Sequence, residues 1–186
     1  MLFYIKRHLW LEIIVTVLLA GIGHLFIRRL NLPFVVTPSA RAVGLGVAGW
    51  MWLVLWTLAV QQVYRVVRGR HFADELTGSL AKEFANPTLT QVVFGGLTAC
   101  AEEIFFRGFL QQELGLLIAS VLFMIAHFGR RDIRVVSYWS IFQGLYLGLF
   151  FQYSGNLLVP MIAHGFFDIG GMVYFRRFME HREKHA

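Results

Sequence analysis

Cys100-Ala-Glu-Glu-Ile-Phe-Phe-Arg-Gly108 places two adjacent carboxylates and a guanidinium inside a long, mostly apolar run. A charged side chain at membrane depth costs several kcal/mol, so such residues persist mainly where they face a protein interior and have a partner or a function. The stretch therefore predicts a polar site buried inside a bundle of membrane helices.

The composition is typical of a membrane protein. The chain of 186 residues is 57% hydrophobic and 15% charged, whereas soluble domains carry about 25% charged residues. A membrane-spanning helix needs about 20 apolar residues, so the length allows about six spans and no sizeable soluble domain. The sequence predicts an all-α fold, a polytopic membrane helix bundle in which residues 1–186 form a single integral membrane domain. The single cysteine, Cys100, excludes an intrachain disulfide.

Six apolar segments are the candidate membrane helices. They cover approximately residues 9–27, 42–64, 89–109, 114–128, 135–151 and 157–175. The fourth is short for a full span. The first superficially resembles a signal peptide, but it contains Glu12 and lacks a small-x-small cleavage site, so we expect a retained helix.

Basic residues at the ends of these segments set the expected orientation. With the N-terminus inside, the cytoplasmic side receives 13 of the 17 basic residues: Lys6, Arg7, Arg65, Arg68, Arg70, Lys82, Arg130, Arg131, Arg134, Arg176, Arg177, Arg182 and Lys184. The opposite side receives Arg28, Arg29 and Arg41. Because positive charge gathers on the cytoplasmic side, we expect a multi-pass protein of the cell (inner or plasma) membrane with both termini in the cytoplasm. The basic residues would contact the headgroups of the phospholipid membrane. No nucleic-acid-binding module is recognisable in the sequence.

Two further features concern helix packing. Residues 65–86 form a cytoplasmic connection in which Phe72, Leu76, Leu80 and Phe84 recur every four residues, which indicates an amphipathic helix on the inner membrane surface. An ordinary solvated linker is the alternative. Gly144-x-x-x-Gly148 is a small-residue motif of the kind that brings two membrane helices close together.

The two adjacent glutamates must have different roles. On a helix, Glu102 and Glu103 point about 100° apart. Glu103 and Arg107 have the i,i+4 spacing and the favourable order for an ion pair along one helix. Such a pair spares both groups most of the cost of being buried alone. Glu102 is then the unpaired carboxylate that can face the interior.

Two other apolar segments carry polar pairs one helical turn apart. Phe123 and His127 share one face of the fourth segment, and His164 and Asp168 share one face of the sixth. Convergence of these faces on Glu102 is a hypothesis about packing. A carboxylate in an apolar pocket is suited to act as a base on a water molecule, and a histidine can orient that water or carry its proton.

The motifs that contain these residues resemble those of a known family. Glu102-Glu103-x-x-x-Arg107, Phe123-x-x-x-His127 and His164-x-x-x-Asp168 resemble the three motifs of the CAAX protease and bacteriocin-processing (CPBP/Abi) family of glutamate-dependent intramembrane endopeptidases. The resemblance covers about residues 89–175. It implies an intramembrane CAAX-type endopeptidase, a hydrolase that acts on a peptide or protein substrate.

The resemblance also implies roles for the catalytic residues. Glu102 would activate the attacking water, and His127 would help to position it. His164 and Asp168 would stabilise the oxyanion. Asparagine is common at the position of Asp168 in this family, and an ionised aspartate would repel an oxyanion. Asp168 is therefore either protonated or, as we favour, serves to orient His164.

Glu103, Arg107 and Phe123 would be structural or substrate-orienting, with Phe123 as a packing wall. No cofactor is expected. Zinc is the alternative, because Glu102, His127 and His164 could supply three ligands. The sequence has no His-Glu-x-x-His, the most specific zinc signature.

Three functions follow in order of preference. The first is hydrolysis of a peptide bond in a membrane-associated or peptide precursor substrate, which includes peptide maturation or removal of a C-terminal tag. The second is a bacteriocin-immunity protein that binds a peptide, since the family also includes such factors. The third is a transporter lined by polar side chains, against which the lack of repeated halves argues weakly.

Overall fold

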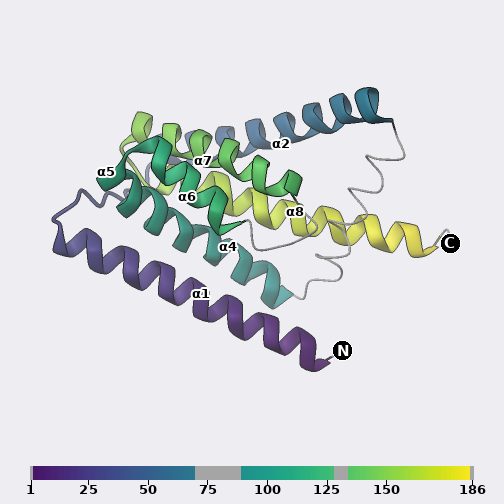
Figure 1. The fold of residues 1–186 in the computed structure, drawn as a ribbon, viewed down its shortest axis with the longest axis horizontal. Helices are drawn as coiled ribbons and strands as arrows, with labels where there is room; N and C mark the ends of the chain where they lie inside the picture. The colour runs from purple at the N-terminus through teal and green to yellow at the C-terminus, as the bar shows by residue number, and fades with distance from the viewer. Residues whose placement is uncertain (1, 70–88, 128–133, 185–186) are drawn as a thin grey trace.

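The fold is built from helices alone in the residues described by the computed structural model, which are 2–69, 89–127 and 134–184. Figure 1 shows them as a bundle of long, roughly aligned helices. The predicted all-α bundle is therefore confirmed. The expected surface helix beyond residue 69, and the basic residues Arg130 and Arg131, lie outside the described residues.

Each predicted apolar segment corresponds to one helix or one continuous helical run. The helices are α1 (Leu2–Arg29), α2 (Ala40–Arg68), α4 (Leu89–Glu103), α6 (Leu116–Ala126), α7 (Arg134–Ser154) and α8 (Leu158–Lys184). After α4 the chain continues without a break through the π-helix η1 (Ile104–Leu110) into α5 (Gln111–Leu114). The fourth predicted segment is indeed short, because α6 has only 11 residues.

Helix α8 contacts α2, α4 and α7, whereas α1 covers α4 and η1, and α6 packs on α7. The first residues of α1 and the last residues of α8 lie at the same end of the bundle, while the α1–α2 connection lies at the other end (Figure 1). Successive helical runs therefore alternate in direction. Helices α4 and α7 run parallel to each other, and α8 runs antiparallel to both.

Two tight turns sit at the end of the bundle that carries the α1–α2 connection. Gly115, with φ of 84°, separates α5 from α6, and this left-handed conformation favours glycine. Beside the α7–α8 turn, the Asn156 side chain donates to the Thr37 carbonyl at 2.7 Å and accepts from the Thr37 amide at 3.2 Å. These bonds tie the α1–α2 connection to the α7–α8 turn.

The small-residue motif on α7 allows a close approach to α6. A Cβ atom at Gly144 would lie only 3.1 Å from the Cα of Ser120, and one at Gly148 would collide with Leu116 and Gln111. The prediction that this motif packs against a neighbouring helix is confirmed. It brings backbone carbonyls of α7 within reach of polar side chains from η1 and α5.

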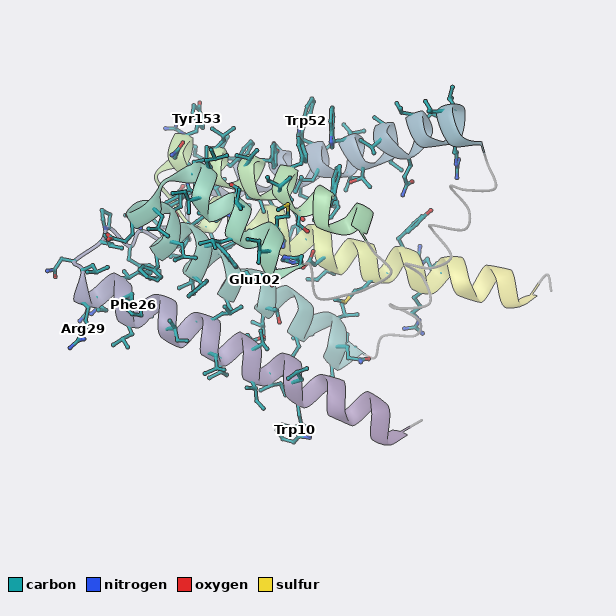
Figure 2. The ribbon with its side chains drawn as sticks, in the orientation of Figure 1. Trp10, Phe26, Arg29, Trp52, Glu102 and Tyr153 are labelled. Carbon is teal, nitrogen blue, oxygen red and sulfur yellow. The ribbon has the colours of Figure 1, made fainter. Side chains whose placement is uncertain are left out.

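The outer surface is apolar over several helices. Among the described residues, two helical runs are long and apolar enough to cross a membrane, Ala40–Val67 and Leu89–Leu114, and Leu116–Ala126 and Leu158–Tyr174 are shorter apolar helices. Trp10, Trp52 and Tyr153 are exposed and point away from the bundle (Figure 2). Apolar surface on this scale marks contact with a membrane or with another protein, and it fits a membrane protein here.

Candidate active site

Glu102 and Glu103 lie at the junction between α4 and the π-helix η1. Glu102 and Glu103 are the last two residues of α4, and η1 begins at Ile104. π-helical turns inside α-helices occur frequently at functional sites. The Glu103 side chain is 0% exposed, whereas that of Glu102 is 16% exposed. The neighbouring carboxylates therefore lie in different surroundings.

Glu103 is the centre of a buried ion-pair cluster. Its Oε1 accepts a hydrogen bond from Arg107 Nη1 at 2.9 Å and contacts His164 Nδ1 at 2.8 Å. Because an ionised carboxylate can only accept, the Nδ1 of His164 must carry the hydrogen of that bond. The other oxygen of Glu103, Oε2, is buried and has no hydrogen-bond partner in the described part of the chain.

Arg107 connects the ion-pair cluster to helices α7 and α6. Its Nη2 donates to the Gly144 carbonyl at 3.2 Å, and its guanidinium carbon lies 4.6 Å from the ring centroid of Phe123. One turn further on, Gln111 Nε2 donates to the Gly148 carbonyl at 2.9 Å. Because the two donors and the two acceptors are each four residues apart on parallel helices, the two bonds form a short ladder.

The less buried side of the cluster is formed by Glu102 and Asp168, which lie on either side of the buried His164. His164 Nε2 lies 3.9 Å from Glu102 Oε2 and 3.6 Å from Asp168 Oδ2. Both distances are too long for a direct hydrogen bond. The Asp168 side chain is 34% exposed, and Glu102 lies in the middle of the bundle (Figure 2). We call these three residues the open edge of the site.

His127 joins the cluster through the ring of Phe123. Phe123 is fully buried, and its ring centroid lies 4.5 Å from that of His127 and 5.8 Å from that of His164. His127 Nδ1 is 2.8 Å from the Phe123 carbonyl oxygen, which can only accept, so Nδ1 carries the hydrogen. Phe123 thus packs against both imidazoles, as expected of a wall.

The structure brings the predicted site residues together, five of them through direct polar contacts and His127 through the ring of Phe123. Glu102, Glu103, Arg107, His164 and Asp168 are linked by direct polar contacts within 3.9 Å, and His127 is linked through Phe123. The expected Glu103–Arg107 pair is present. The catalytic roles assigned to these residues stay predictions.

The sequence did not predict three contacts, the Glu103–His164 bond and the two bonds of the ladder. The bond between Glu103 and His164 joins residues that are 61 positions apart, and no spacing signals it. The ladder to α7 had a faint signal, because Arg107 and Gln111 repeat the four-residue spacing of Gly144 and Gly148.

The residues as they stand do not form a metal site. In the part of the chain that the structure describes, no group of three or more His, Cys, Asp or Glu side chains is arranged to hold a metal ion. Nδ1 of His164 and Nδ1 of His127 each donate to a protein acceptor, so Nε2 is the ring atom of each histidine that could ligate a metal.

Comparison with known proteins relates the chain to a family and to a bacterial protein. Residues 84–170 match the family described as "Type II CAAX prenyl endopeptidase Rce1-like". The chain is 36% identical over 121 residues to "Uncharacterized protein YpbD" of Bacillus subtilis (strain 168), a match that covers 62% of this chain and 61% of the relative. The chain therefore spans about three fifths of the length of that relative. No solved structure matches the chain.

The match includes all three polar motifs, from Glu102 to Asp168. The resemblance predicted from those motifs is confirmed. Residues 84–170 of this chain are therefore similar to the Rce1-like family of type II CAAX prenyl endopeptidases.

Proposed function

We propose that this chain is an intramembrane endopeptidase that hydrolyses a peptide bond with a water molecule activated by Glu102. The observation that carries the proposal is the asymmetry of the two glutamates. Glu103 is committed to Arg107 and His164, whereas Glu102 is partly exposed and faces His164 Nε2 across 3.9 Å. A carboxylate that has no committed partner and is accessible from one side is suited to general-base work.

The proposed reaction uses only side chains of this chain. Glu102 takes a proton from water as the water oxygen attacks the carbonyl carbon, and the carbonyl electron pair moves to the oxygen. The carbon–nitrogen bond then breaks, and the departing amine receives the proton from Glu102. His127, whose Nδ1–H is held by the Phe123 carbonyl, presents its other ring nitrogen to the water.

His164 and Asp168 act on the developing oxyanion. Glu103 holds the Nδ1–H of His164, so Nε2 is the ring atom that faces the open edge. With both ring nitrogens protonated, Nε2–H donates to the oxyanion, and the carboxylates around the ring balance its charge. Asp168, 3.6 Å from Nε2, orients the ring.

We propose a membrane-associated protein or a peptide precursor as the substrate class. Its scissile bond would enter at the open edge, and its apolar part would stay in the bilayer. The matched family is described as a CAAX prenyl endopeptidase, so an internally quenched farnesylated peptide ending in Cys-aliphatic-aliphatic-X is a suitable first probe. Peptide maturation and removal of a C-terminal tag are the cellular tasks that fit this chemistry.

We also propose a multi-pass topology with both termini in the cytoplasm. Arg65, Arg176 and Arg177 lie at the end of the bundle where α1 begins, and Arg41 lies at the opposite end (Figure 1). In the sequence, 13 of the 17 basic residues belong to the termini and connections that this topology assigns to the cytoplasm. Positive charge at that end favours a cytoplasmic position for it.

Replacement of Glu102 by Gln should abolish cleavage. The amide cannot take a proton, and general-base catalysis contributes about 10²–10⁴-fold to rate. The Glu102→Gln protein should keep the wild-type melting midpoint, because Glu102 makes no direct hydrogen bond to His164. Cleavage of the quenched peptide by purified protein in detergent, together with a thermal scan, measures both quantities.

Glu113→Gln provides the matched control for this substitution, since Glu113 is an exposed carboxylate on α5. It should leave cleavage and melting unchanged. Wild-type activity in Glu102→Gln would rule out the proposed base. A protein that acts only by binding a peptide would keep cellular protection after the same substitution.

Removal of metal should leave activity intact. Cleavage of the same peptide is measured after treatment with a chelator, and zinc is quantified in the purified protein. Full activity at substoichiometric zinc is the expected result, because no step of the proposed reaction needs a metal. Loss of activity on chelation that added zinc restores would replace the present mechanism with a zinc-dependent one.

Cysteine labelling in intact cells tests the topology. In a Cys100→Ala background, Arg41→Cys should react with a membrane-impermeant maleimide added outside, and Arg177→Cys should react only after lysis. Both arginines are exposed in the structure, so burial does not confuse the comparison. The reverse pattern would show the opposite orientation, and equal labelling of both from outside would contradict the multi-pass arrangement.

A further inference from the structure

Gln143 on α7 is a buried polar residue that the proposed reaction does not use. Its side chain is only 6% exposed. Its amide nitrogen, Nε2, is buried and has no hydrogen-bond partner among the described residues. Leaving a buried donor unsatisfied is unfavourable, and such groups in native proteins require an explanation.

Gln111 shows what a structural glutamine looks like in the same protein. It is 5% exposed, and its Nε2 donates to the Gly148 carbonyl at 2.9 Å. The two glutamines are therefore equally buried but differ in whether the amide is paired. Gln143 does not have the structural explanation that Gln111 has.

The packing of α7 places Gln143 at the level of the site. Leu147, one turn further along α7, packs with Leu53 and Ala163 in one buried cluster. Because α7 and α8 are antiparallel (Figure 1), the turn of α7 that carries Gln143 lies opposite the turn of α8 that follows Ala163. That turn of α8 carries His164 and Asp168.

The residue next to Gln143 is already part of the cluster. The Gly144 carbonyl accepts a hydrogen bond from Arg107, which itself pairs with Glu103. Gln143 is thus adjacent in sequence to a direct contact of the ion-pair cluster. Its amide is held on a rigid helix, which is where a preorganised donor is most effective.

The open edge is short of neutral donors. Glu102 and Asp168 are acceptors when ionised, and one of the two N–H groups available to His164 is taken by Glu103. A tetrahedral intermediate places a full negative charge on the former carbonyl oxygen, which needs donors already in position. A primary amide supplies one without adding charge.

We propose that Gln143 is an oxyanion-binding residue: its Nε2–H donates to the carbonyl oxygen of the scissile peptide and, more strongly, to the oxyanion. This inference rests on the proposed endopeptidase function and adds a residue from α7, outside the three motifs. No proton is transferred, since the amide keeps its hydrogen throughout. The donor that has no partner among the described residues finds its acceptor in the substrate.

Gln143→Met and Gln111→Met are compared in full-length protein purified in detergent. Gln143→Met removes a donor that has no partner in the free protein, so its melting midpoint should equal or exceed that of the wild type. Its kcat on the quenched farnesylated peptide should fall by about 10²-fold with little change in KM, as expected for loss of one oxyanion donor. Gln143→Glu should also lose kcat, because a carboxylate cannot donate.

Gln111→Met should show the opposite pattern. It breaks the bond to the Gly148 carbonyl, so the midpoint should fall while the kcat of the folded protein stays at the wild-type value. The proposal is overturned if Gln143→Met lowers the melting midpoint as Gln111→Met does. It is also overturned if Gln143→Met keeps the wild-type kcat. If the wild-type protein cleaves no peptide, the endopeptidase function is contradicted instead. A fall in the melting midpoint of Gln143→Met contradicts the role of Gln143 whether or not the protein is active.

Discussion

The burial of the Glu103 carboxylate is the constraint on which the site depends. A charge removed from water costs several kcal/mol unless ion pairing and hydrogen bonds compensate it. Arg107 and His164 supply that compensation from 2.9 and 2.8 Å. Because His164 belongs to α8 and Arg107 also reaches the Gly144 carbonyl of α7, this one carboxylate fixes the positions of three helical segments relative to one another.

Division of labour between the two glutamates follows from this constraint. Glu103 is held from two sides and cannot change partner without leaving Arg107 buried and unpaired. Glu102, one residue earlier, points elsewhere, and its Oε2 lies 3.9 Å from Nε2 of His164. The ion-pair cluster thus makes polar groups tolerable inside an apolar bundle, and the open edge leaves one carboxylate available for the proposed chemistry.

Much of the fold could be predicted because it depends on local patterns. Apolar runs located the six helical segments seen in the described residues, and the i,i+4 rule located the Glu103–Arg107 pair. The Glu103–His164 bond could not be predicted, because it depends on how α8 packs against α4, which no spacing within one helix specifies. Neither the π-helix after Glu103 nor the Gln143 Nε2 that lacks a partner among the described residues could be predicted, because no sequence pattern signals either of them. The predicted surface helix after α2 lies outside the described residues. The orientation of the protein in the membrane stays a prediction.

A double-mutant cycle on Glu103 and Arg107 tests most directly whether this buried pair holds the site together. Free energies of unfolding in detergent are measured for Glu103→Gln, Arg107→Met and the double variant. Each single substitution should cost about 3–5 kcal/mol, because it leaves the other charge buried without its partner. The double variant should then cost clearly less than the sum of the two. Additive losses, or single losses close to zero, would contradict the account.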